Sequence, residues 1–233
     1  IVTSAIGLDR RIGRKCLTGA LGYGGPCFPR DNVALSFLAR AVGMHADLAA
    51  TTDRVNRSRA QKIVDRLRDF IQPGTTVAIL GLAYKPYSHV VEESQGIYLA
   101  KAFSKVGARV VAYDPLANEA ARAELHDQSI ILDSVTECLE QAEVVLVTTP
   151  DPVFERLQAR DFCDHRPSVT VVDFWRILDQ KLSHVPGIRY IAVGRSVDDR
   201  ANGARLAELW ESVAPRTDCD AVAIGAVTDA GDL

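Results

Sequence analysis

Apolar residues recur at helical spacing through the first part of the chain. After a glycine-rich stretch, the apolar positions of 35–42 lie three to four residues apart, which predicts a helix capped by Asp31 or Asn32 and ended by Gly43. A longer helix is predicted from about residue 46 to 71, because its apolar residues also repeat at this spacing between charged ones. The first third is therefore predicted to be helical.

Further along the chain, short apolar runs alternate with helical patterns. Four valine-rich runs are typical of strands buried on both faces: 77–80, 110–113, 144–147 and 169–172. Helical patterns lie between them at 94–106, 118–125 and 135–142. The alternation predicts an α/β fold with a Rossmann-like open parallel sheet and helices on both faces. Such sheets bind ligands at the carboxyl ends of their strands.

These patterns divide the chain into three parts. Residues 1–72 are the predicted helical dimerisation region, residues 73–200 the Rossmann-like domain and residues 201–233 a C-terminal tail with a helix at about 206–213. Residues 1–6 have the pattern of the last turn of a helix closed by Gly7, so we expect a fragment of a longer protein. The long helix at about 46–71 either lies on its own domain or packs against a copy, and we expect a homodimer through this helix.

The composition is that of a globular protein. The 233 residues are 47% hydrophobic and 24% charged with a formal net charge of -3, so we expect a small-molecule ligand and no nucleic acid. The five cysteines form no CxxC pairs, which indicates reduced thiols, a cytoplasmic location and no zinc site. We expect no association with a membrane, because no stretch approaches the roughly 20 apolar residues of a membrane span.

The densest group of chemically useful residues is segment 22–31, which reads Gly-Tyr-Gly-Gly-Pro-Cys-Phe-Pro-Arg-Asp. Glycines let a backbone approach a ligand closely, and a helix beginning at about Asn32 would direct its positive end toward Cys27. A thiolate is favoured there, Arg30 adds positive charge, and Asp31 can hold or deprotonate a water. The alternative is that Cys27 is a small buried hydrophobe in an ordinary turn. We assign structural roles to Cys16, Cys138, Cys163 and Cys219.

A second candidate site follows the first predicted strand. The segment 79–86 leaves the strand at Gly81 and places Lys85 at the ligand-binding end of the sheet, where a lysine can meet a phosphate. The glycine pattern is not GxGxxG, and this fingerprint follows none of the predicted strands. Asp114, after the next strand, has the position of a ribose-binding acid, but Tyr-Asp-Pro at 113–115 equally indicates a turn.

Together these segments resemble the UDP-glucose/GDP-mannose dehydrogenase family. The family motif GYGGSCFPKD corresponds to residues 22–31, and a KPxTDDxRES-like stretch corresponds to residues 85–94. Weaker similarities lie at 11–13, 55–56, 113–115 and 172–176. The likeness extends in the family's order to about Arg195.

The resemblance implies an enzyme that oxidises the C6 hydroxymethyl group of a UDP- or GDP-hexose to a carboxylate and reduces two NAD. Hydride removal would give an aldehyde, the Cys27 thiolate would add to it, and a second oxidation would leave a thioester that water hydrolyses. By position, Cys27 would be the nucleophile and Asp31 would organise water or proton transfer.

The resemblance also implies binding residues. Arg11 would reach the ligand of the neighbouring subunit, and Tyr84 and Lys85 would contact the nucleotide. The substrate-binding candidates are Arg11, Leu21, Gly22, Tyr23, Gly24, Gly25, Tyr84, Lys85 and Arg176. The candidates beside the cofactor are Cys27, Arg30 and Glu92. NAD would be bound mainly by an N-terminal domain that this sequence does not contain, so we expect the chain alone to be inactive.

Some positions depart from the family pattern. Pro26 replaces a serine, Arg30 a lysine, Glu92 an arginine associated with the cofactor, and Trp175 an arginine that binds substrate in some members. An acid cannot make the phosphate contact of an arginine, so the identity of the nucleotide sugar stays open. Two alternatives also stay open: a non-catalytic nucleotide-binding or dimerisation module, and another kind of thiol enzyme, for which His45 is the nearest histidine.

Overall fold

We describe the chain from a computed structural model that covers residues 2–15, 17, 19–164, 166–195 and 199–212. Residues 1–194 form one compact unit and residues 195–233 a second, of which helix α11 (Asp199–Ser212) is described. The part of the expected tail after residue 212, Cys16 and Cys219 lie outside the described residues, and the helix expected at about 206–213 falls within α11 as far as residue 212. Within those residues, no helix is long and apolar enough to cross a membrane. The division of the first unit near residue 72 stays a prediction.

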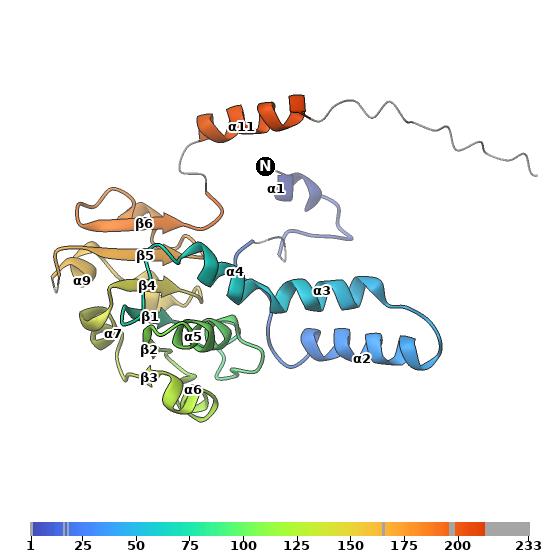
Figure 1. The fold of residues 1–233 in the computed structure, drawn as a ribbon, viewed down its shortest axis with the longest axis horizontal. Coiled ribbons are helices and arrows are strands. Elements are labelled where there is room, and N and C mark those ends of the chain that lie inside the picture. Colours follow the sequence, from blue (N-terminus) through green and yellow to red (C-terminus); the bar gives the residue numbers. More distant parts are fainter. Residues whose placement is uncertain (1, 16, 18, 165, 196–198, 213–233) are drawn as a thin grey trace, which may run out of the picture. The chain divides into compact units, whose positions relative to one another are not determined.

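A parallel sheet of six strands forms the centre of the first unit, in the order β3-β2-β1-β4-β5-β6 (Figure 1). The strands are β1 (Thr76–Leu80), β2 (Arg109–Tyr113), β3 (Ile130–Ile131), β4 (Val144–Val147), β5 (Val169–Asp173) and β6 (Ile188–Ala192). Val77 of β1 pairs with Val110 of β2 on one side and with Val144 of β4 on the other. The strand order reverses between β1 and β4, where sheets of this kind bind ligands. The predicted α/β fold is confirmed.

Helices cover both faces of this sheet (Figure 1). One face packs against α4 (Arg59–Arg66), α5 (Gln95–Lys105) and α6 (Asn118–Leu125). The other packs against α7 (Val135–Gln141), α8 (Pro152–Glu155), α9 (Ala159–Cys163) and α10 (Asp179–Leu182). Along β1, Val77 and Ile79 enter the first core, whereas Ala78 and Leu80 enter the second. Because both faces are covered, the central strands β1 and β4 are buried along their whole length and are mainly apolar.

The end of β1 is packed tightly against the start of α5. A Cβ atom on Gly96, in the first turn of α5, would lie 2.2 Å from the carbonyl oxygen of Gly81. Gly81 itself has a φ of +110°, and a Cβ there would lie 2.3 Å from Oγ1 of Thr149. The Thr148 hydroxyl donates hydrogen bonds to the carbonyls of Leu80 and Gly81. The two glycines therefore allow helix and strand to meet without a gap.

The helical region differs from its prediction in two respects. It contains α1 (Val2–Ile6), α2 (Phe28–Ala41) and α3 (Asp47–Arg57). The expected start at Asp31 or Asn32 is wrong, because α2 begins at Phe28 and tolerates Pro29 in its first turn, where no N–H is needed. The expected single helix at 46–71 is also wrong. It is interrupted at Ser58, whose hydroxyl donates to the carbonyl of Val55 over 2.8 Å, and α4 ends at Arg66.

Several short elements were not predicted from the sequence. These are β3, β6, α8, α9, α10 and the 3₁₀ turn at His126–Gln128, each of two to five residues. The helices among them contain too few positions to show a helical period, β3 has only two residues, and the apolar run of β6 is interrupted by Arg189. The longer predicted elements 118–125 and 135–142 are present as α6 and α7.

Substitution of Gly96 tests the tight packing at the end of β1. We expect Gly96→Ala to lower the free energy of unfolding by about 3 kcal/mol, because the added methyl group would overlap a backbone carbonyl that cannot move freely. Gly203 of α11 is the control, since a Cβ there would meet no atom within 4 Å. Urea unfolding followed by circular dichroism measures both variants. Equal stability of Gly96→Ala and the unsubstituted protein would contradict this packing.

Candidate functional site

Cys27 occupies the N-cap position of α2 and is exposed to solvent. Its carbonyl accepts the first helical hydrogen bond, from the Asp31 N–H over 2.8 Å. The cysteine therefore lies closer to the helix N-terminus than the sequence predicted, next to N–H groups without partners in the helix and at the positive end of its dipole. The alternative that Cys27 is a small buried hydrophobe is wrong.

Arg30 and Asp31 form an ion pair within the first turn of α2. The guanidinium Nη2 lies 3.1 Å from the carboxylate Oδ1, and the two side chains are 68% and 64% exposed. A pair this exposed contributes little to stability. The Asp31 carboxylate is open to water and lies one helical turn from Cys27.

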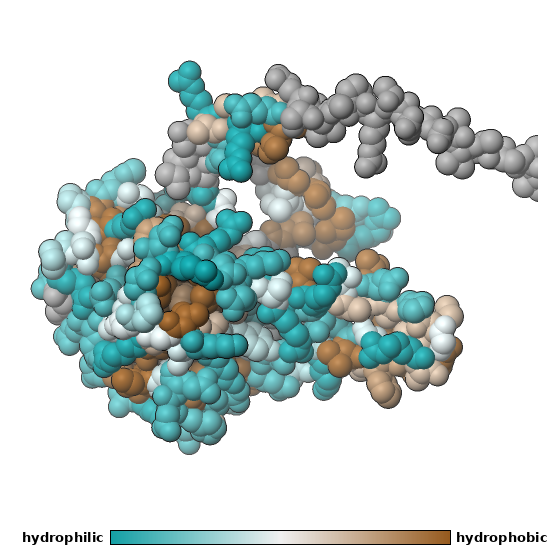
Figure 2. All heavy atoms as spheres, in the orientation of Figure 1, coloured by the Kyte–Doolittle hydropathy of each residue, from teal (hydrophilic) through white to brown (hydrophobic). Residues whose placement is uncertain are grey.

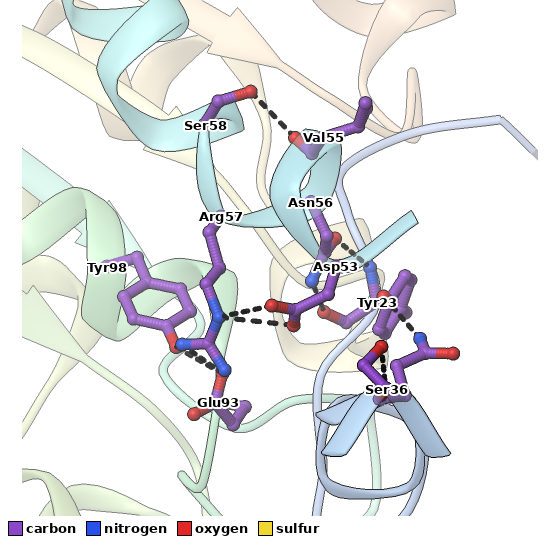
Figure 3. A network of polar contacts seen from close by, with 10 residues as sticks. Tyr23, Ser36, Asp53, Val55, Asn56, Arg57, Ser58, Glu93 and Tyr98 are labelled. Atoms are coloured by element: carbon purple, nitrogen blue, oxygen red, sulfur yellow. Dashed lines mark hydrogen bonds and ion pairs between the residues drawn. The ribbon is translucent and has the colours of Figure 1, made fainter. Parts of the chain in front are cut away.

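The loop that leads to Cys27, residues 19–27, is called the cysteine loop below. It is held in place through Tyr23 (Figure 3). Asn56 of α3, only 4% exposed, accepts from the Tyr23 N–H over 3.0 Å and donates to the Tyr23 carbonyl over 2.8 Å. Gln95, the first residue of α5, donates to the same carbonyl over 3.2 Å. The Asn32 amide donates to the Tyr23 hydroxyl over 2.9 Å. The loop is thereby attached to three helices.

The glycines of the loop allow close contact with protein atoms. A Cβ on Gly22 would lie 2.1 Å from Oδ1 of Asn56, and one on Gly24 would lie 2.4 Å from the Glu93 carbonyl oxygen. Gly25 has a φ of +85°, and a Cβ there would lie 2.7 Å from the ring of Tyr84. The sequence predicted close approach to a ligand. In the structure, these glycines let the loop fit between α3 and residues 84–95.

A network of charged and polar groups joins α3 to the same segment (Figure 3). Arg57 forms an ion pair with Asp53, and its Nη1 lies 3.4 Å from Oε2 of Glu93 and donates to the Tyr98 hydroxyl. That hydroxyl donates to Glu93. Burial and the neighbouring Glu93 carboxylate raise the pKa of Tyr98. The hydrogen bond from Arg57 to Asp53 raises the pKa of Arg57. Tyr98 therefore stays neutral and Arg57 stays charged at neutral pH.

Residues of the β1–α5 loop lie beside the cysteine loop. The Gly25 N–H donates to the Glu92 carbonyl over 2.9 Å, and the Tyr84 ring packs against Gly25. Lys85 is exposed, with its ammonium group 5.3 Å from the centroid of the Tyr84 ring. The side chain of Glu92 is also exposed. The structure thus gathers five of the expected site positions, Gly24, Gly25, Tyr84, Lys85 and Glu92.

Two protein-family models match most of the chain. The central-domain model of the UDP-glucose/GDP-mannose dehydrogenase family matches residues 1–58, and the UDP binding domain model of the same family matches residues 78–180. The chain belongs to this family. The family is one of NAD-dependent sugar dehydrogenases.

Individual relatives agree with the family match. The chain is 38% identical over 177 residues to a UDP-glucose 6-dehydrogenase of Haloferax volcanii, covering 72% of the chain and 41% of that protein. It is 30% identical over 200 residues to a UDP-glucose 6-dehydrogenase of Rickettsia conorii, covering 84% and 46%. A UDP-glucose dehydrogenase structure from Pyrobaculum islandicum has a TM-score of 0.69 and 34% identity, covering 84% and 43%. The chain spans about half the length of the relatives it matches.

Two of the expected substrate-binding residues of the family make local contacts. Arg11 is exposed and pairs with Asp9, whose pKa is lowered by hydrogen bonds from the Arg11 side chain and backbone. Arg176 has a φ of +61°, and its N–H donates to Asp173 over 2.7 Å. The contacts described for these arginines do not join them to the cysteine loop, so their roles stay predictions.

Buried carboxylates end two strands of the family's sheet domain. Asp114, 4% exposed, accepts from the N–H groups of Leu82, Ala83, Leu116 and Ala117. Asp114 therefore belongs to a turn, which was one of its two interpretations, and its carboxylate accepts hydrogen bonds from the protein backbone. Asp173, the last residue of β5, accepts from the N–H groups of Trp175, Arg176 and Leu178 and from the Tyr190 hydroxyl. The Trp175 indole donates to the Thr148 carbonyl and covers the end of β4.

A cleft of about 550 Å³ lies along the cysteine loop on the α3 side. Its lining residues are Gly19, Ala20, Leu21, Gly22, Tyr23, Thr51, Thr52, Val55, Asn56 and Arg59. Leu21, Gly22 and Tyr23 were expected at the site, whereas the α3 side of the cleft and Arg59 were not. The sequence signal for them was the weak similarity at residues 55–56. Arg59 donates to the Ala20 carbonyl over 3.2 Å.

The remaining described cysteines lie in the sheet domain. Cys138 is fully buried in the core, and burial raises the pKa of its thiol to about 12. Cys163 at the end of α9 is partly buried. The buried position of Cys138 fits the structural role expected from the sequence, because a thiol held neutral is a poor nucleophile.

Proposed function

We propose that the chain is the part of a nucleotide-sugar 6-dehydrogenase that carries the nucleophilic cysteine and binds the sugar nucleotide. The observation that carries this proposal is the exposed Cys27 at the N-cap of α2, on a loop held by partly buried hydrogen bonds. The family match and the UDP-glucose 6-dehydrogenases among its relatives support it.

The reaction converts the C6 hydroxymethyl group of a UDP- or GDP-hexose to a carboxylate. NAD, when bound, supplies the oxidising chemistry. At the aldehyde level, the Cys27 sulfur bonds to the carbonyl carbon and its oxygen takes a proton, which gives a thiohemiacetal. Loss of that proton and of a hydride leaves a thioester on Cys27. Asp31 holds the water that adds to it, and breakage of the carbon–sulfur bond returns the thiolate and releases the acid.

We place the NAD pocket outside the described residues. A dinucleotide fold uses an acid after its second strand and the N-terminus of the first helix of the sheet. Here the Asp114 carboxylate accepts four backbone N–H groups, and the Ser94 hydroxyl caps α5 while Gly96 packs on Gly81. These positions do not fit a dinucleotide. Cys27, Arg30 and Glu92 are exposed and can border a cofactor that other residues hold.

The nucleotide binds beside Tyr84 and Lys85 in this proposal. The exposed Lys85 ammonium lies next to the Tyr84 ring, which contacts the loop that leads to Cys27. A lysine without a neighbouring carboxylate among its described contacts is suited to a phosphate group. In this proposal the nucleotide lies beside Gly25, which the Tyr84 ring contacts, and the nucleophile is Cys27, two residues further along the same loop. One extended ligand can therefore reach both.

We further propose that a second copy of the chain covers α2. The half of the expected 46–71 helix that forms α4 packs on its own domain through Ala60 and Val64. Exposed apolar side chains gather on α2 and the residues after it instead, as Figure 2 shows around the α2–α3 hairpin. They are Phe28, Val33, Leu35, Phe37, Leu38, Val42, Met44 and Leu48. An apolar group of this size is typical of a protein interface.

Replacement of the cysteine tests the proposed nucleophile. We expect Cys27→Ser to lower the rate of acid formation from UDP-glucose and NAD by at least about a thousandfold, because a serine hydroxyl at this position has no base to ionise it. The complete protein is assayed by chromatography of the nucleotide-linked acid, with Cys163→Ser as the control. Acid formation by Cys27→Ser at the unsubstituted rate would rule out Cys27 as the nucleophile.

Two cations on opposite sides of the cysteine loop test where the nucleotide lies. We expect Lys85→Ala to weaken UDP binding about tenfold, through loss of a charged contact to phosphate. Arg59→Ala, in the cleft on the α3 side, is expected to bind UDP normally. Isothermal titration calorimetry measures both dissociation constants. The opposite result, with affinity lost only in Arg59→Ala, would place the nucleotide in the cleft.

The proposed dimer is tested by one charge on α2. Phe37 is 68% exposed, and we expect Phe37→Asp to convert a dimer to a monomer, because the interface would have to bury an unpaired carboxylate. Leu116→Asp is the control, since Leu116 is 58% exposed but lies in the sheet domain. Light scattering after size-exclusion chromatography gives both masses. A Phe37→Asp protein that stays dimeric would contradict an interface on α2.

A further inference from the structure

We propose that Asn56 is a positioning residue for Cys27 and acts through the backbone of Tyr23. The inference rests on the proposed role of Cys27 as the nucleophile. Asn56 lies outside the cysteine motif, on a different helix, and makes no described contact with Cys27 itself.

The Asn56 side chain forms hydrogen bonds with both polar backbone groups of Tyr23. The Asn56 amide accepts from its N–H and donates to its carbonyl, at 3.0 and 2.8 Å, and is 4% exposed. Side-chain amides, found in Asn and Gln, provide a donor and an acceptor together without charge. Both bonds are partly buried, and their loss would leave the Tyr23 N–H without its partner and its carbonyl with the Gln95 amide alone.

The chain between Tyr23 and Cys27 needs this anchor. It contains Gly24 and Gly25, which restrict the backbone less than any other residue, followed by Pro26. The second anchor of the loop is the Gly25 N–H on the Glu92 carbonyl. With Tyr23 fixed on one side and α2 on the other, the segment cannot move without breaking the hydrogen bonds of Tyr23 or Gly25.

Gln95 assists from the other side of the loop. Its Nε2 donates to the Tyr23 carbonyl over 3.2 Å, while its buried Oε1 has no hydrogen-bond partner among the described residues. Replacing this side chain by an apolar one therefore removes one hydrogen bond to Tyr23 and leaves no unsatisfied polar group at position 95. The Tyr23 carbonyl is the point where α3, α5 and the cysteine loop meet.

The decisive variant is Asn56→Asp in the complete protein. At pH 8 its carboxylate still accepts from the Tyr23 N–H but places a charged oxygen against the Tyr23 carbonyl. We expect kcat to fall at least about tenfold, because a displacement of about 1 Å at a nucleophile is enough for this. KM for UDP-glucose, or for GDP-mannose if the protein oxidises that sugar instead, stays unchanged, since Asn56 lies away from the proposed nucleotide contacts.

Acid rescue separates positioning from general damage. When the new carboxyl group is protonated, its O–H can donate to the Tyr23 carbonyl and restore the lost bond. The ratio of kcat between Asn56→Asp and the unsubstituted protein should therefore rise as the pH falls from about 8 to about 6, towards the range where carboxyl groups protonate. Taking the ratio removes the ordinary pH dependence of the thiol reaction.

Asn118 offers a matched control in the sheet domain. Its Oδ1 accepts from the Asp114 N–H and its Nδ2 donates to the Leu132 carbonyl, both over 2.9 Å. Asn118→Asp makes the same chemical change to the same kind of backbone clamp, and we expect kcat to stay near that of the unsubstituted protein. If Asn56→Asp does not fold, Gln95→Met is measured instead, with a smaller fall in kcat at unchanged KM expected.

Three results would overturn the inference. They are an equal fall of kcat in Asn56→Asp and Asn118→Asp, a kcat ratio that does not rise at lower pH, and, for Gln95→Met, a kcat equal to that of the unsubstituted protein. Failure of the proposed function is recognised separately. In that case the unsubstituted protein forms no acid, or Cys27→Ser forms it at the same rate.

Discussion

The backbone of the cysteine loop has polar groups that no helix or sheet satisfies. Buried N–H and carbonyl groups must nevertheless find partners, since each unpaired group costs about 1–3 kcal/mol. The Asn56 side chain is the partner of the Tyr23 N–H and carbonyl, and the Glu92 carbonyl is the partner of the Gly25 N–H. The position of Cys27 depends on these bonds, because the residues between them and the sulfur are mainly glycine and proline.

The sheet contributes to the site through its first connection. Gly81 and Gly96 let α5 begin directly on the end of β1, and this fixes both ends of the long loop between them. That loop carries Tyr84 and Glu92 to the cysteine loop, while Glu93 joins it to α3 through Arg57. The crowded turn, which in our proposal leaves no room for a dinucleotide on this sheet, thus also positions the residues around Cys27.

Local patterns in the sequence predicted the strands and the place of Cys27. The strands β1, β2, β4 and β5 were recognisable because burial on both faces requires continuous apolar runs, and Cys27 because of its glycines and prolines. The clamp on Tyr23 was not predictable, since its partners Asn56 and Gln95 are distant in the sequence and neither residue type indicates a pairing by itself. The interruption at Ser58 was missed because the apolar repeat continues across it.

In the proposed reaction, Cys27 is covalently attached to the substrate between the two oxidations. This attachment can be detected by rapid acid quenching of the complete protein during turnover of UDP-glucose with NAD, followed by proteolysis and mass spectrometry. We expect a peptide containing Cys27 that carries the sugar nucleotide as a thioester and loses it on treatment with hydroxylamine. Steady formation of the acid, with the Cys27 peptide unmodified at every quench time, would show that Cys27 forms no such intermediate.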